Sequence, residues 1–87
     1  MALRLAGEIL YLVEYFGVRD DRGTLIALRV TDVDLAGILG CSVREVNALV
    51  ANLRRERLVW RDARHLIVNR KRLAQYDTGA RAQHANL

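Results

Sequence analysis

The chain lacks the features that would tie it to a membrane or to secretion. Cys41 is the only cysteine among the 87 residues, so no internal disulfide can form, and cytoplasmic residence is the expectation. No apolar run approaches the roughly 20 residues that a transmembrane helix needs. Glu8 and Glu14 interrupt the apolar N-terminal stretch and no small-residue cleavage site follows it, which argues against a signal peptide.

Catalytic and metal-binding patterns are absent as well. His65 and His84 stand apart, and neither has a cysteine or second histidine at metal-ligand spacing. No Gly-rich phosphate loop or nucleophile motif occurs, so we expect no metal, no cofactor and no enzyme. The remaining composition, 52% hydrophobic and 28% charged residues in a short chain, is typical of one small globular domain.

Basic residues are concentrated in the second half of the chain. Residues 1–53 carry five arginines against seven acidic residues, a net charge of −2. Residues 54–72 carry eight basic residues against two acidic ones, a net charge of +6, and residues 73–87 are neutral. Such a segment fits a polyanionic partner, but a solvated surface accounts for it equally well.

The N-terminal third predicts a helix followed by a strand. Apolar residues at three- and four-residue spacing indicate an amphipathic helix from Ala2 to Phe16, which Gly17 can end in a left-handed conformation. A turn cluster at residues 20–23 then leads to a short strand over Leu25–Val30. The residues expected to face the core from this helix are Leu3, Ala6, Ile9, Leu10, Val13 and Phe16.

The C-terminal third predicts a hairpin and a short helix. Leu58–Arg61 and His65–Val68 are β-rich runs separated by three residues, and we expect Trp60 to lie in the core. Asn69 can cap a helix that ends at Tyr76. The domain is therefore expected to span residues 1–76, with residues 77–87 forming a disordered tail.

The strongest signal lies between these parts, where two short helices flank a turn. Thr31 can cap the first helix, and Ser42 with Glu45 predicts a capping box at the start of the second. Gly40 can reverse the chain with a positive φ, and the small Ala36 lets the helices approach. This is helix-turn-helix spacing, although an ordinary corner of two helices shares it. The wedge between the helices is expected to hold Leu35, Leu39, Cys41, Val46 and Leu49.

The stretch from Val30 to Ala74, above all its TDVDLAGILGCS and NLRRERLV portions, resembles the C-terminal domain of the cyclic-AMP receptor protein/FNR (Crp/Fnr) family of transcriptional regulators. The resemblance implies an α+β winged helix-turn-helix of order α-β-α-α-β-β-α, with a small three-helix core and a β-hairpin wing. It implies that the second helix of the motif enters the major groove of double-stranded DNA. In this family a sensor domain and a dimerisation helix precede the region. We therefore expect a homodimeric parent and an isolated domain that is a monomer or weak dimer.

The sequence departs from the family where bases are read. Members commonly carry Arg-Glu or Val-Glu after the capping residue and an arginine four residues beyond that glutamate. Here Val43 and Arg44 follow Ser42, Ala48 replaces the later arginine, and Asp32 stands where a polar or basic residue is usual. The family's usual target sequence therefore does not transfer to this chain.

The residues expected to bind DNA are Thr31, Ser42, Val43, Arg44, Asn47, Arg54, Arg55, Arg64 and His65. Arginine and asparagine early in the second helix can contact guanine and adenine, and the two caps can hold phosphates at helix N-termini. The arginines late in that helix, and the two residues at the hairpin tip, are placed for the DNA backbone. The alternative is a protein–protein interaction domain that kept the fold and lost DNA binding. Asp32, Asp34 and Ala48 favour that alternative, and the +6 segment opposes it.

Overall fold

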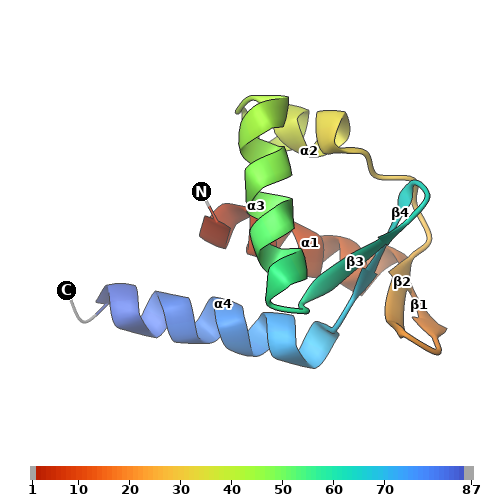
Figure 1. Ribbon diagram of the computed structural model, residues 1–87. Coiled ribbons are helices and arrows are strands. Elements are labelled where there is room, and N and C mark those ends of the chain that lie inside the picture. Colours follow the sequence, from red (N-terminus) through yellow and green to blue (C-terminus); the bar gives the residue numbers. More distant parts are fainter. Residues whose placement is uncertain (1, 86–87) are drawn as a thin grey trace.

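The computed structural model describes residues 2–85, which form four helices and a four-stranded antiparallel sheet (Figure 1). The predicted α+β winged helix-turn-helix is confirmed, with one strand more than expected. The elements are α1 (Ala2–Phe16), β1 (Gly17–Asp20), β2 (Gly23–Ile26), α2 (Asp32–Leu39), α3 (Val43–Arg55), β3 (Val59–Asp62), β4 (His65–Val68) and α4 (Arg70–Ala85).

The sheet joins two hairpins that lie far apart in the sequence. Its strand order is β1-β2-β4-β3, so β2 pairs with β4 in the middle. Leu25 is opposite Ile67, and Ile67 is in turn opposite Trp60 on β3. The predicted hairpin of β3 and β4 is therefore held to the rest of the domain along one of its strands.

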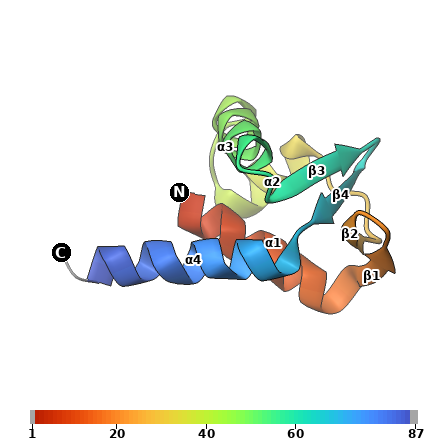
Figure 2. The ribbon, with the colours of Figure 1, turned by 60° about the horizontal axis from the view of Figure 1, so that its bottom comes forward.

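Helix α1 supplies one side of the core and packs against α4, which runs beside it (Figure 2). Its buried face is slightly rotated from the predicted one, because Leu5 and Leu12 lie inside while Phe16 is 40% exposed. Leu10 is partly buried against the same core. The buried core residues of α1 are Leu5, Ala6, Ile9, Leu12 and Val13.

The segment after α1 corrects two predictions. Gly17 does not cap α1 in a left-handed conformation but begins β1, a strand that the sequence analysis missed. Glycine is needed because a Cβ there would overlap the Val13 carbonyl oxygen and lie 2.8 Å from the Thr24 methyl carbon. The predicted strand Leu25–Val30 stops pairing at Ile26, after which the chain runs irregularly to the cap of α2.

The helix-turn-helix forms as predicted. Thr31 and Ser42 are the N-caps of α2 and α3, and Gly40 ends α2 at φ 70° and ψ 36°, in the left-handed region that glycine adopts without strain. Its N–H donates to the Ala36 carbonyl oxygen at 2.9 Å. In the predicted wedge Leu35, Leu39 and Val46 are buried, with Cys41 and Leu49 partly buried against them.

Helix α4 is longer than predicted. Asn69 caps it, its side-chain oxygen accepting from the Arg72 N–H at 3.1 Å, but the helix continues past Tyr76 to Ala85. Residues 77–85, expected to be a disordered tail, are helical, and residues 86–87 of that tail lie outside the described part. Alanine, glutamine and arginine dominate this stretch and favour helix, which outweighs the cost of Gly79. Within residues 2–85, no helix combines the length and apolar character required to cross a membrane.

Candidate nucleic-acid interface

The solvent face of α3 carries most of the predicted site. Val46, Val50 and Leu53 turn one face of the helix into the core. The exposed Glu45 and Asn52 lie at one edge of the opposite side, and the rest of that side is exposed over three turns and comprises Val43, Arg44, Asn47, Ala48, Ala51, Arg54 and Arg55. Because 3.6 residues make a turn, these positions fall on one side of the helix. We call this set the α3 outer face.

Both helix N-termini of the motif are capped by hydroxyls. The Ser42 hydroxyl accepts from the Glu45 N–H at 3.1 Å and donates to the Glu45 carboxylate at 3.2 Å. The reciprocal capping box forms instead at Thr31, which accepts from the Asp34 N–H while the Asp34 carboxylate accepts from the Thr31 N–H at 2.9 Å. Ser42 is exposed and Thr31 is partly exposed, and the positive end of a helix dipole stabilises an anion.

The Asp34 carboxyl is the group in this motif with a perturbed pKa. Hydrogen bonds from the Thr31 backbone N–H, and then from the Thr31 hydroxyl, lower the pKa of Asp34. The charged form of Asp34 therefore stabilises the start of α2. The acid that the sequence offered as a reason against DNA binding has a structural use.

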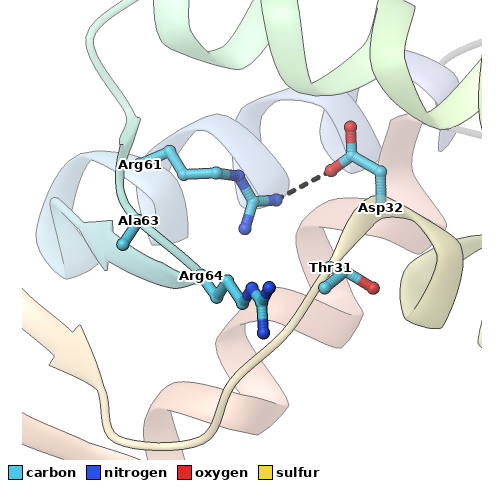
Figure 3. Close-up of a pocket in the computed structure, with 5 residues that line it drawn as sticks. All are labelled: Thr31, Asp32, Arg61, Ala63 and Arg64. Atoms are coloured by element: carbon cyan, nitrogen blue, oxygen red, sulfur yellow. Dashed lines mark hydrogen bonds and ion pairs between the residues drawn. The ribbon is translucent and has the colours of Figure 1, made fainter.

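The hairpin tip is fixed against the chain that leads into α2 (Figure 3). The Val30 N–H donates to the Arg64 carbonyl oxygen at 2.9 Å, and the Val30 carbonyl oxygen accepts from Arg61 at 2.5 Å. Arg61 also pairs with Asp32 at 2.7 Å, with 22% and 26% of the two side chains exposed. These contacts set Arg64 beside Thr31, across a hollow of ≈ 220 Å³.

At the tip itself the chain turns through Ala63, whose φ is 53°, and Arg64. Arg64 is exposed, and in the close-up its guanidinium points toward the start of α2 (Figure 3). His65 is partly buried opposite Asp62 in the β3–β4 ladder. Of the two residues predicted at the tip, Arg64 is the more accessible.

The corner between α3 and β3 holds a second hollow, of ≈ 420 Å³, lined by Ala51, Arg54, Arg55 and Trp60. The prediction that Trp60 lies in the core is wrong, since Trp60 is 36% exposed. The side chains of a strand alternate between the two faces of a sheet, and Val59 takes the buried position next to it. Trp60 instead extends the α3 outer face toward the hairpin.

Ion pairs reduce the charge of the basic segment unevenly. Arg61 pairs with Asp32, and Arg70 pairs with Glu14 at 3.0 Å. Arg22 of the β1–β2 turn pairs with Asp20 and with Asp62, which lowers the pKa of Asp20 and raises that of Arg22. Within residues 2–85, the arginines of the α3 outer face and Arg64 form no ion pair, so their charges stay available to a partner.

A family model for the Crp-like helix-turn-helix domain matches residues 3–76. The chain belongs to this family. The resemblance expected from the sequence is thereby confirmed. The match begins within α1, well before the stretch that suggested it, and ends within α4, two residues after that stretch. A comparison with curated protein sequences finds no match.

Solved structures of Crp-family regulators share the fold. The imidazole-bound form of the CO-dependent transcription factor CooA from Carboxydothermus hydrogenoformans superposes with a TM-score of 0.79 at 20% identity, covering 87% of this chain and 36% of that one. The CRP-family transcriptional regulator TTHB099 from Thermus thermophilus gives 0.76 at 24% identity, covering 90% of this chain and 40% of that one. The chain thus spans well under half the length of these regulators.

Sequence reasoning missed the contacts that place the Crp-like hairpin. In the sequence, Arg61 is one charge of a basic segment and Asp32 is an acid that disfavours DNA binding. The one sign of this contact in the sequence is Asp32 itself, an acid at a position where the family commonly has a polar or basic residue. The partner that explains it lies 29 residues away and becomes visible only in the fold.

Proposed function

We propose that this chain is the DNA-binding domain of a transcriptional regulator and binds double-stranded DNA sequence-specifically, with α3 in the major groove and the β3–β4 hairpin on the backbone. The observation that carries the proposal is the α3 outer face. It is exposed along its length, and its arginines have no carboxylate partner within residues 2–85. A helix with its side chains measures about 10–12 Å across, and the major groove is about 12 Å wide.

The residues divide into readers of bases and binders of phosphate. Arg44 and Asn47 lie in the first two turns of α3, where a helix reaches base edges, and can make bidentate contacts to guanine and adenine. Phosphates are the proposed partners of the remaining polar residues, which hold the helix in register. These are Thr31 and Ser42 at the helix N-termini, Arg54 and Arg55 late in α3, and Arg64 and His65 at the hairpin.

The second candidate is a protein–protein interaction domain, which the exposed face of α2 favours. Val33 and Ile38 on that helix are 65% and 50% exposed. The two acids that favour this candidate in the sequence, Asp32 and Asp34, have structural partners and are weaker evidence for it. Asp32 is neutralised by Arg61, and Asp34 is engaged by Thr31 at the helix cap. The uncompensated arginines therefore favour DNA.

Salt dependence tests the proposal on the chain as it is. We expect the chain to be a monomer or weak dimer. One recognition helix then leaves mainly the phosphate contacts, so the expected Kd for duplex DNA is about 10⁻⁴–10⁻⁶ M at physiological salt. If Arg54, Arg55 and Arg64 each neutralise one phosphate, affinity should fall about 40-fold between 50 mM and 200 mM salt. A gel shift or fluorescence anisotropy titration at the two salt concentrations measures this.

A matched variant completes the experiment. Arg19 on β1 is exposed and lies outside the proposed interface, so Arg19→Ala should keep the slope of wild type. The double variant Arg54→Ala/Arg55→Ala should flatten it by about two units. Affinity for DNA that does not change with salt, or an absence of binding, would contradict the proposal and favour a protein–protein interaction domain instead.

A further inference from the structure

The α3 outer face between positions 43 and 51 presents a mixture of polar and apolar side chains to solvent. Arg44 and Asn47 are the only residues of the α3 outer face between positions 43 and 51 that can hydrogen-bond through their side chains. The other three positions are apolar: Val43, which is 38% exposed, and the exposed Ala48 and Ala51. Three of these five side chains therefore offer no hydrogen-bonding group, and the exposed Glu45 beside them already accepts from the Ser42 hydroxyl at 3.2 Å.

The fold does not explain the exposed valine. Val43 is the first residue of α3 and is not among the residues of the hydrophobic core, whereas Val46 and Val50 of the same helix are. Valine also has only modest helix propensity, so the position gains nothing as a start of the helix. Val43 is thus an apolar side chain placed where the proposed DNA contact begins.

The chemistry of base edges limits what such a surface can meet. In the major groove, guanine, cytosine and adenine present hydrogen-bond donors and acceptors, and thymine alone adds an apolar group, its C5 methyl. A methyl group pressed against a donor or acceptor removes water from it and supplies no partner, which is unfavourable. The same methyl group against a thymine methyl buries apolar surface from both sides.

From this juxtaposition we infer that Val43 and Ala48 are specificity-determining residues that select thymine through its C5 methyl group. The inference rests on the proposed function, since it needs α3 in the major groove, and it adds the class of target. The preferred half-site carries thymine at the one or two positions facing these side chains, next to the bases read by Arg44 and Asn47. Alanine at position 48 also keeps the helix backbone close to the bases, because no long side chain intervenes.

Deoxyuridine gives a direct test, because it differs from thymidine only by that methyl group. The full 87-residue chain, fused to a dimerising coiled coil, first selects its preferred duplex from a randomised pool. Each thymine in the selected half-site is then replaced singly by deoxyuridine, and affinity is measured by anisotropy. We expect a loss of about threefold to fourfold at one or two positions, and little change at the others.

Two variants show whether these side chains read the methyl. Val43→Ser removes both side-chain methyl groups and leaves a hydroxyl in their place, and Ala48→Ser adds a hydroxyl to an exposed position. Each should abolish the deoxyuridine effect at one position while the melting temperature stays near that of wild type. The matched control is Val18→Ser on β1, where the valine is 46% exposed but outside the proposed interface, and it should keep the full effect.

The outcomes distinguish a failure of this inference from a failure of the proposed DNA binding. Salt-dependent binding without any deoxyuridine effect overturns the selection of thymine and leaves the proposed function standing. A deoxyuridine effect that survives in both variants also overturns it, because the methyl then acts through DNA shape. A chain that binds no duplex at low salt removes the proposed function and the inference together.

Discussion

Val46 is the residue on which the helix-turn-helix register depends. None of its side chain is exposed, and it lies on the face of α3 that packs toward α2 and the core. Val46→Asp should leave the domain unfolded at room temperature. An unpartnered buried carboxylate costs several kcal/mol, and the whole stability of a small domain is about 5–15 kcal/mol. Thermal melting by circular dichroism measures this, with Asn47→Asp as the control on the exposed side. A cooperative melt of Val46→Asp near wild type would contradict the register.

Asp34 makes the start of α2 sensitive to acid. Its pKa is lowered in the folded chain by the hydrogen bonds from Thr31, so the unfolded chain binds the proton more tightly. The stabilising contribution is therefore complete above the ordinary aspartate pKa, and it is lost as the pH falls below about 4. Asp34→Asn should lose less stability than wild type between neutral and acid pH. Melting temperatures across that range test this, and Asp21→Asn in the β1–β2 turn should behave as wild type does.

At the scale of elements, Arg61 decides where the hairpin sits. It donates to the Val30 carbonyl oxygen and pairs with Asp32, and the Val30 N–H in turn holds the Arg64 carbonyl oxygen. Arg61→Met should cost about 1–3 kcal/mol, because it leaves a partly buried carboxylate without its partner. The Val30 amide should also exchange its hydrogen faster. Hydrogen exchange followed by NMR measures this, with the exposed Arg57→Met as control. Unchanged protection of Val30 would show that the hairpin is held by the β2–β4 pairing alone.

The sequence predicted the elements well where the signal was local. Caps at Thr31 and Ser42, the reversal at Gly40 and the hairpin ending at Val68 each follow from residues within a few positions of one another. Strand β1 was missed because the feature that marks its start is the close approach of Gly17 to α1 and β2. That approach is visible only in the folded chain. The predicted end of α4 is too early because Asp77, Thr78 and Gly79 are typical of a helix end, whereas the alanines, Arg81 and Gln83 that follow favour helix.

At the scale of the whole molecule, the charge pattern needed the fold to be interpreted. The +6 segment appeared uniform in the sequence, but Arg61 and Arg70 are committed to Asp32 and Glu14, residues 29 and 56 positions away. The arginines that stay without a carboxylate partner within residues 2–85 include the three on α3 and Arg64. The list of candidate residues could be drawn from the sequence. The division between structural and available charges could not, because it depends on long-range partners.

That division leads to a contrast between two single substitutions. Arg44 lies on the first turn of α3, and Arg64 lies at the hairpin tip beside Thr31. Arg44→Ala should remove about 1–3 kcal/mol of discrimination at one base pair, because a lost bidentate contact affects one base. Arg64→Ala should weaken every sequence about equally and flatten the salt slope by about one unit, because phosphate contacts are independent of sequence.

The contrast is measured with the dimerised chain, on the selected duplex and on duplexes carrying single base changes, at several salt concentrations. Val46→Asp cannot serve as a negative control, since it removes the fold, but Arg19→Ala on β1 can. Uniform weakening by Arg44→Ala together with a changed sequence preference in Arg64→Ala would reverse the two assigned roles. If neither substitution alters binding, the DNA face is not formed by α3 and the hairpin. The exposed Val33 and Ile38 on α2 then become the surface to test against a protein partner.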